Sequence, residues 1–316
     1  MTPAHPNTYL PRRQARSVFV TLRGLRYHAH VWGDPSLASA QRPPLLLLHG
    51  WMDVGASFQF LVDELAQADG FDRWVIAPDW RGFGLTATPQ ADTYWFPDYL
   101  ADLDALMDAV LPVAQFPQVD LLGHSMGGNV VMSYAGVRPE RIRRLINLEG
   151  FGLPQADPSQ APKRLTQWLD ELKTPQQLKA YATVEDVAAR LLKNNPLLAP
   201  DKAAWLAPHW AQPAADGRWH VLGDPAHKRV NPVLYRVEEI LQTWKLIAAP
   251  LLWAEGDRTE MAKWWGSRYS HAEFNHRLDH VRQVEKVVLS PCGHMLHHDQ
   301  PAALARHLTA FLNGPD

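Results

Sequence analysis

Short apolar runs alternate with amphipathic stretches along most of the chain. The candidate buried strands are runs of mostly apolar residues: Pro44–Leu48, Trp74–Ala77, Val119–Leu122, Leu145–Leu148, Pro250–Ala254 and Lys286–Leu289. Parallel strands that are buried on both faces read as continuous apolar runs. Apolar residues at helical spacing predict helices between them, at Asp98–Leu111, Met126–Val137 and Pro301–Leu312. The pattern predicts an α/β fold in which helices flank a mostly parallel sheet.

An antiparallel hairpin is expected before the first of these strands. Ser17–Leu22 and Leu25–Trp32 are rich in β-branched and aromatic residues. Arg23-Gly24 stands between them as a two-residue turn. The hairpin therefore extends the edge of the predicted sheet.

The alternation of strands and helices stops between Leu148 and Pro250. This stretch is rich in Pro, Gln, Ala and Trp, and it predicts short helices joined by proline turns, the clearest at Asp170–Ala180 and Thr183–Lys193. The strand pattern resumes afterwards, so an insertion explains the gap better than a second independent domain. We expect a core formed by residues 1–150 and 245–316, with a helical cap at 151–244.

Composition narrows the range of functions. The 316 residues carry 31 Lys and Arg against 33 Asp and Glu, a formal charge of −2, which gives no reason to expect a nucleic-acid partner. Cys292 is the only cysteine, so the fold does not depend on an internal disulfide. Met1 to Arg16 contains no apolar core of a signal peptide, and no apolar run approaches a membrane span. We expect a cytoplasmic enzyme that acts on a small molecule away from the membrane; the sequence leaves the oligomeric state open.

Gly123 to Gly127 has the pattern G-x-S-x-G between a predicted strand and a predicted helix. A serine at such a sharp turn takes strained backbone angles, and the flanking glycines avoid clashes with the neighbouring strand and helix. This context predicts Ser125 as a catalytic nucleophile.

A serine nucleophile needs a positioned base, and His294 is the candidate. It follows Gly293 after the last predicted strand and precedes the terminal helix. The nearby His297, His298 and Asp299 have spacings that would also suit a metal site. We favour a solvated loop and the start of a helix for them, and we expect neither a metal nor an organic cofactor.

The base in turn needs an acid that fixes its tautomer. Asp257 follows the strand Pro250–Ala254, which places it at the carboxyl edge of the sheet, and the order Ser, Asp, His suits this kind of site. The alternative acid is Glu149, at the end of the strand Leu145–Leu148. We expect Asp257 to be the acid.

The oxyanion of the reaction needs preorganised N–H donors. The backbone N–H of Met126, at the start of a helix, is one candidate, and that of Trp51, in the loop after Pro44–Leu48, is the other. Trp51 and His124 are also expected to contact the substrate.

Taken together, these residues resemble the α/β-hydrolase superfamily over essentially the whole chain. The segments that carry the resemblance are His49 to Trp51, Asp79 to Gly84, Gly123 to Gly128, Gly256-Asp257 and Gly293 to His297. The resemblance implies that the loop from Asp79 to Gly84 shapes the site without being catalytic. The inserted segment is similar to the cap of serine hydrolase-like proteins, on the strength of Leu148 to Gly152, Asp216 to Trp219 and Asp224-Pro225.

The expected reaction is hydrolysis of an ester-like bond through an acyl-enzyme on Ser125. Tryptophans in or after the insertion favour a mostly apolar substrate, although individually they fit a structural core as well: Trp168, Trp205, Trp210, Trp219, Trp244, Trp253, Trp264 and Trp265. A thioesterase or carbon–carbon bond hydrolase would use the same triad. A cofactor-free perhydrolase or haloperoxidase-type activity and a non-catalytic binding module stay open as well.

Overall fold

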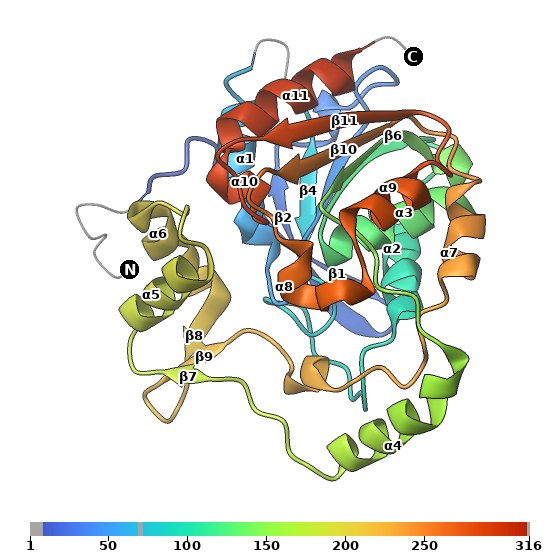
Figure 1. Cartoon of the computed structure of the whole chain (residues 1–316). Coiled ribbons are helices and arrows are strands. Elements are labelled where there is room, and N and C mark those ends of the chain that lie inside the picture. Colours follow the sequence, from blue (N-terminus) through green and yellow to red (C-terminus); the bar gives the residue numbers. More distant parts are fainter. Residues whose placement is uncertain (1–8, 69–71, 315–316) are drawn as a thin grey trace.

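The computed structural model describes residues 9–68 and 72–314, and its centre is an eight-stranded sheet in the order β1-β2-β4-β3-β5-β6-β10-β11 (Figure 1). Its strands are β1 (Arg16–Leu22), β2 (Leu25–Trp32), β3 (Leu45–Leu48), β4 (Val75–Pro78), β5 (Val119–His124), β6 (Ile142–Leu148), β10 (Leu251–Gly256) and β11 (Val284–Leu289). The pairs β1–β2 and β2–β4 are antiparallel, and the remaining pairs are parallel. The predicted fold class and its strands are confirmed.

The β1–β2 hairpin closes on the predicted two-residue turn. Arg23 and Gly24 both have positive φ, 47° and 79°. Such angles at both central residues belong to the turn whose twist matches that of the flanking strands. The hairpin adds antiparallel strands at one edge of the sheet.

Helices cover both faces of the sheet. One face carries α1 (Gln59–Leu65), α10 (Leu296–Asp299) and α11 (Pro301–Asn313); the other carries α2 (Phe96–Val110), α3 (Met126–Val137), α7 (Val237–Trp244), α8 (Met261–Trp265) and α9 (His271–Leu278). The all-leucine sequence of β3 follows from this arrangement. Leu45 and Leu47 pack into the core on the α11 face, whereas Leu46 and Leu48 pack into the core on the α3 face. Successive strand side chains point to opposite faces, so a strand covered on both sides needs apolar residues throughout.

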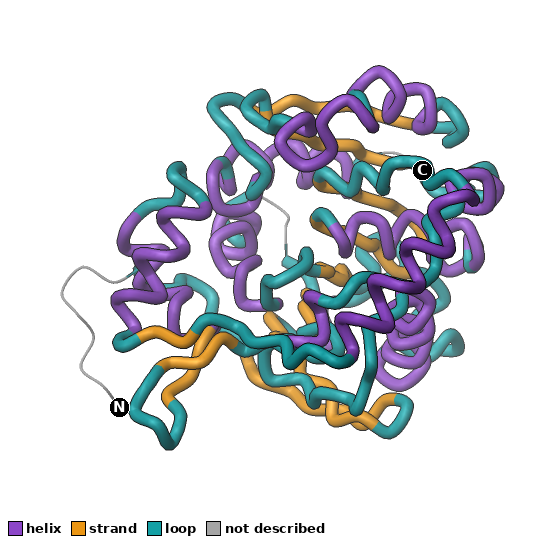
Figure 2. The backbone as a smooth tube through the Cα atoms, turned by 60° about the horizontal axis from the view of Figure 1, so that its bottom comes forward, coloured by secondary structure: helices purple, strands orange, loops and turns teal. Residues whose placement is uncertain are grey.

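The inserted segment contains helices and a small sheet. Its elements are α4 (Ala161–Leu172), β7 (Ala180–Tyr181), α5 (Val184–Asn194), α6 (Pro200–Trp210), β8 (Ala211–Pro213) and β9 (Trp219–Val221), and β7-β9-β8 form an antiparallel sheet. In Figure 2 this sheet is the orange group beside a pair of helices, apart from the main sheet. The insertion contains helices, as predicted, and the small sheet beside them was not predicted.

The individual helices of the insertion were predicted unevenly. A capping box at Thr183 and Asp186 begins α5 close to the predicted start, whereas the expected helix Asp170–Ala180 is wrong because α4 ends at Leu172. Helix α7 was assigned to the cap by sequence, but it packs against α3 of the core.

A separate hydrophobic cluster joins the insertion to the core. Leu191 and Leu206 of the insertion belong to this cluster together with two core residues. These are Val54, which lies before α1, and Phe60, which lies in its first turn. Helix α4 instead lies apart from α5 and α6 and has no buried residue (Figure 1). The small sheet and its two helices thus form a docked unit, and α4 is an exposed arm.

No helix in the described residues is long and apolar enough to cross a membrane. The N-terminal segment that was predicted to lack a signal-peptide core lies partly outside the described residues, at positions 1–8.

Candidate active site

Ser125 stands at the turn between β5 and α3. Its backbone angles are φ 52° and ψ −113°, which a non-glycine residue adopts only at a cost of about 1–3 kcal/mol. The turn is held by a hydrogen bond from the Ser125 N–H to the carbonyl of Leu148, at 2.8 Å. The neighbouring glycines are required by close backbone approach: a Cβ on Gly123 would lie 2.2 Å from the carbonyl oxygen of Gly127, and one on Gly127 would lie 2.1 Å from that of Leu48. The predicted strained serine turn is present.

Strands β5, β6 and β10 bring their carboxyl ends together beside this turn. His124 pairs with Leu148, and Leu148 pairs with Ala254, so the residues that follow these strands start from the same edge. Glu149, directly after β6, has φ 54°, and its N–H donates to the carbonyl of Ala254 at 3.2 Å. This edge is where open α/β sheets place their functional groups.

Glu149 is the carboxylate that contacts His294. Its Oε2 lies 2.6 Å from Nδ1 of His294, and its Oε1 accepts the N–H of Gly256 at 2.7 Å. The Glu149 side chain is fully buried, whereas that of His294 is 28% exposed. A carboxylate on Nδ1 makes that nitrogen the donor and leaves Nε2 unprotonated, as a general base requires.

The prediction that Asp257 contacts His294 is wrong. Its Oδ2 accepts the hydroxyl of Ser290 at 2.6 Å, and its Oδ1 accepts the N–H of Cys292 at 2.8 Å. These hydrogen bonds, that from Ser290 foremost, lower the pKa of the exposed Asp257 carboxyl. Asp257 braces the loop that leads to His294 instead of reaching the imidazole itself.

The predicted oxyanion donors are free. Neither the N–H of Trp51 nor that of Met126 donates a hydrogen bond to another described residue. The carbonyl of Gly50 accepts Nδ1 of His49 at 2.8 Å, while Nε2 of His49 accepts the N–H of Trp80 at 2.9 Å. Because a trans peptide points its C=O and N–H in opposite directions, this contact turns the Trp51 N–H away from His49.

The loop from Asp79 to Gly84 hydrogen-bonds to the segments that surround the proposed oxyanion donors. The Asp79 carboxylate accepts the N–H of Gly55 at 2.8 Å and that of Leu85 at 2.9 Å, and it contacts Nδ1 of His28 at 2.7 Å. Burial lowers the pKa of His49, so its ring stays neutral as both hydrogen bonds require. The loop is occupied by structural contacts, in line with the supporting role that the resemblance implies.

The two residues predicted to contact the substrate differ in their exposure. Trp51 is 53% exposed and free to meet a ligand. His124 is 2% exposed, and its Nε2 donates to the main-chain carbonyl of His294 at 2.8 Å, so the prediction that it contacts the substrate is not supported. Trp264, to which the sequence assigned no individual role, packs edge-on against the His294 ring at 4.6 Å and is 42% exposed. Only its place after Asp257 in the chain could have signalled this.

The single cysteine is unsuited to be a nucleophile. Cys292 is buried, and burial raises the pKa of its thiol. A thiol needs its thiolate form to attack. Ser125 is therefore the stronger candidate at this edge of the sheet.

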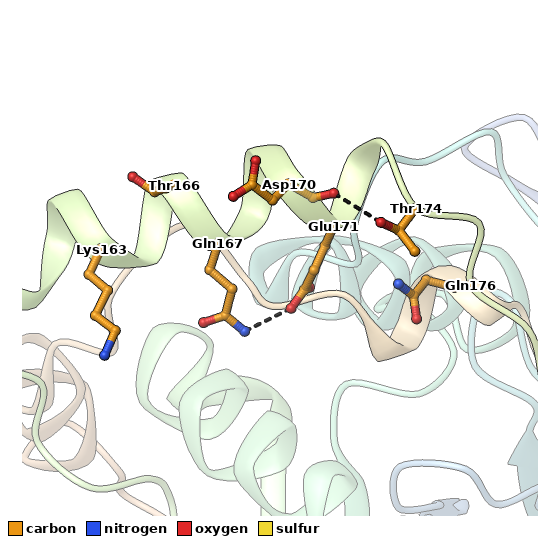
Figure 3. Close-up of a pocket in the computed structure, with 7 residues that line it drawn as sticks. All are labelled: Lys163, Thr166, Gln167, Asp170, Glu171, Thr174 and Gln176. Carbon is orange, nitrogen blue, oxygen red and sulfur yellow. Dashed lines mark hydrogen bonds between the residues drawn. The ribbon is translucent and has the colours of Figure 1, made fainter.

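A groove of about 620 Å³ runs along α4 and is lined by neither Ser125 nor His294 (Figure 3). Lys163, Gln167 and Glu171 point to one side of the helix, and Gln167 donates to Glu171 at 2.7 Å. Its lining residues are polar or charged: Lys163, Thr166, Gln167, Asp170, Glu171, Thr174 and Gln176. No serine, cysteine or histidine lines this groove, so it lacks a nucleophile–base pair for acyl transfer.

Comparisons with known proteins show the family to which the chain belongs. The chain is 26% identical over 259 residues to a serine hydrolase-like protein of Danio rerio, covering 80% of this chain and 75% of that one. It is 33% identical over 113 residues to a 2-hydroxy-6-oxo-2,4-heptadienoate hydrolase of Pseudomonas putida, covering 35% of this chain and 38% of that one. Among solved structures, the thioesterase domain from the curacin biosynthetic pathway superposes with a TM-score of 0.76 at 27% identity, covering 93% of this chain and 99% of that one. The family model of the alpha/beta hydrolase fold matches residues 43–301. The chain belongs to the alpha/beta hydrolase fold family.

Proposed function

We propose that the protein is a serine hydrolase that cleaves an ester-like bond of a small, mostly apolar substrate. The observation that carries the proposal is the hydrogen bond between the buried Glu149 and the partly exposed His294, together with the strained turn at Ser125. In this proposal Ser125 is the nucleophile, His294 the base and Glu149 the acid. Asp257 is then a positioning residue for the loop of His294.

The reaction follows from these roles. Nε2 of His294 takes the proton of the Ser125 hydroxyl as its oxygen attacks the carbonyl carbon, and the buried Glu149 carboxylate stabilises the imidazolium. The N–H groups of Trp51 and Met126 hold the oxyanion. Collapse of the tetrahedral intermediate expels the alcohol, which takes the proton from His294. Water then attacks the acyl-enzyme, with His294 again as base, and releases the acid.

The surroundings of the base favour an apolar substrate. Trp264 packs against the ring of His294 and is 42% exposed, and Trp51, in the loop that carries the proposed oxyanion donor, is 53% exposed. Aromatic side chains bind apolar groups while excluding water. In this proposal the insertion acts as the cap, since the backbone of Leu222 and Asp224, directly after β9, hydrogen-bonds to that of Gly84 and Gly82.

Thioester hydrolysis is the second candidate. It is favoured by the solved thioesterase domain that covers 93% of this chain at 27% identity. The same triad would perform it, because an acyl-enzyme forms in both reactions. The two reactions would differ in the leaving group, an alcohol or a thiol, and not in the catalytic residues.

A fluorophosphonate probe and a matched substrate panel test the proposal. The panel pairs p-nitrophenyl esters with thioesters of the same acyl groups, from acetyl to decanoyl. We expect the probe to label wild type and not Ser125→Ala, with ester turnover abolished in that variant. Failure to label Ser125 in folded protein, together with no turnover of either series, would contradict the proposal. A preference for the thioesters would replace the ester assignment.

A further inference from the structure

A buried group of polar side chains lies directly behind the Ser125 turn. It comprises Asp53, which follows the loop of Trp51, His124 at the end of β5, and His297 in α10. A carboxylate oxygen of Asp53 and one ring nitrogen from each histidine all lie within 4.8 Å of one another. The three residues are 3%, 2% and 0% exposed.

The atoms that face one another in this group lack hydrogen-bond partners. Among the described residues none pairs with Oδ2 of Asp53, Nδ1 of His124 or either ring nitrogen of His297. Nε2 of His297 lies 3.8 Å from Oδ2 of Asp53, which is longer than a hydrogen bond. Buried polar atoms are normally paired, because an unpaired one pays its full desolvation cost.

Hydrogen bonds on the far sides of these residues fix which atoms can accept a ligand. Nε2 of His124 donates to the carbonyl of His294 at 2.8 Å, so its Nδ1 carries a lone pair. Oδ1 of Asp53 accepts Nε1 of Trp210 at 3.1 Å and the hydroxyl of Ser57, which leaves Oδ2 pointing at the histidines.

A second histidine–aspartate group in the same molecule shows the contrast. His28, His30 and Asp79 also lie within the same range of one another. There, however, Nδ1 of His28 contacts Asp79 at 2.7 Å, its Nε2 contacts the hydroxyl of Ser17, and Asp79 accepts the N–H of Gly55. His28 and Asp79 of that group are thus satisfied by hydrogen bonds, so the group gives no comparable reason to expect an ion.

We propose that Asp53, His124 and His297 form a binding site for a divalent transition-metal ion such as Zn²⁺. Two imidazoles and one carboxylate are a ligand set that Zn²⁺ takes, and a water completes the usual four. Ligand atoms about 2.1 Å from a tetrahedral ion lie about 3.4 Å apart, so small side-chain rotations close the site. The carboxylate balances one of the two positive charges.

The ion would join the catalytic loop to the insertion. On one side its ligand His124 holds the backbone of His294, and on the other its ligand Asp53 holds Trp210 of α6. Hydrogen bonds on the far sides of metal ligands orient them and raise metal affinity. The site is thus a positioning element for the base and does not touch the reacting atoms.

Zinc binding to the chelator-stripped full chain tests the proposal without any assay of hydrolysis. We expect about one Zn²⁺ per chain by calorimetric titration, and a rise in Tm of about 4 °C at a free Zn²⁺ concentration 100 times Kd. His297→Gln should abolish both effects. His30→Gln, in the second histidine–aspartate group, is the matched control and should retain them. No zinc binding by the stripped wild type, or binding that survives in His297→Gln and disappears in His30→Gln, would overturn the site.

X-ray absorption on zinc-loaded wild type decides the matter if His297→Gln does not fold. The proposal expects two imidazoles and only oxygen or nitrogen in the first shell. Sulfur from Cys292, or fewer than two imidazoles, would overturn it. Neither experiment depends on Ser125 being a nucleophile, so the metal site and the proposed hydrolysis fail separately.

Discussion

Replacing Glu149 with glutamine distinguishes the two carboxylates that follow neighbouring strands. Glu149 accepts two hydrogen bonds, from the N–H of Gly256 at 2.7 Å and from Nδ1 of His294 at 2.6 Å. A glutamine amide has one acceptor oxygen and one NH₂ donor in place of the two oxygens. If the oxygen stays on Gly256, the NH₂ group faces Nδ1 of His294 and favours the tautomer in which Nε2 carries the proton.

The cost of the wrong tautomer can be estimated. An imidazole protonated at Nε2 cannot accept the Ser125 proton, and an equivalent change in a well-known serine protease lowers kcat about 10⁴-fold. We therefore expect kcat of Glu149→Gln to fall by about 10³- to 10⁴-fold, which corresponds to about 4–5.5 kcal/mol in the activation barrier. KM should change little, because no substrate contact is removed.

Asp257→Asn is the matched control. Its side chain is exposed and accepts only the hydroxyl of Ser290 and the N–H of Cys292. We expect kcat within about tenfold of wild type, since the loop loses one brace and His294 keeps its partner. Both variants would be assayed with a p-nitrophenyl ester after circular dichroism has confirmed folding. A folded Glu149→Gln with near-wild-type kcat, beside an Asp257→Asn that has lost activity, would refute the reasoning.

The remaining predictions concern stability, measured as the urea midpoint of unfolding. Gly127→Ala should cost about 3 kcal/mol or more, because its Cβ would lie 2.1 Å from a carbonyl oxygen of β3; an unchanged midpoint would contradict this. Arg73→Met should cost about 1–3 kcal/mol, because Arg73 is fully buried and lies 2.6 Å from Asp120, which keeps its contact with Arg143 at 2.6 Å in the variant; a stabilised variant would refute the charge argument. Burial lowers the pKa of His30 to about 4 and that of His227 to about 3. The unfolded chain binds protons below its ordinary histidine pKa of about 6.5 while these folded histidines do not, so stability should fall by up to about 1.4 kcal/mol per pH unit for each histidine as pH drops from 6.5 towards 4. Equal midpoints at pH 7 and pH 5 would contradict this.

Local signals were enough to predict the strands and the serine turn. The continuous run Leu45–Leu48 marks a strand buried on both faces, and the glycines around Ser125 are demanded by backbone contacts within a few residues of the turn or with the next strand. Both signals lie in short stretches of sequence. They are therefore readable without knowledge of distant contacts.

The acid could not be chosen by the same reasoning. Glu149 and Asp257 both follow parallel strands, β6 and β10, that lie side by side at one edge. Which carboxylate reaches His294 depends on the path of the loop after β11 and on side-chain length. Both carboxylate oxygens of Asp257 accept hydrogen bonds from that loop, from Ser290 and Cys292. These contacts join residues that are more than 30 positions apart in the chain.

The insertion was difficult to predict because its elements are short. Strands β7, β8 and β9 have two or three residues each, too few for an alternating pattern to appear. The burial of His124 was equally hidden, because it depends on the carbonyl of His294, which is 170 positions away. The cytoplasmic location stays a prediction.

Trapping the covalent intermediate tests the central claim most directly. Wild-type protein would be mixed with a p-nitrophenyl ester, quenched in acid during the first turnover, and analysed by intact mass and peptide mapping. The account predicts a burst of p-nitrophenol of about one equivalent per chain, with the acyl group on the peptide that contains Ser125. An acyl group on a different residue, or steady ester turnover that survives in Ser125→Ala, would contradict it.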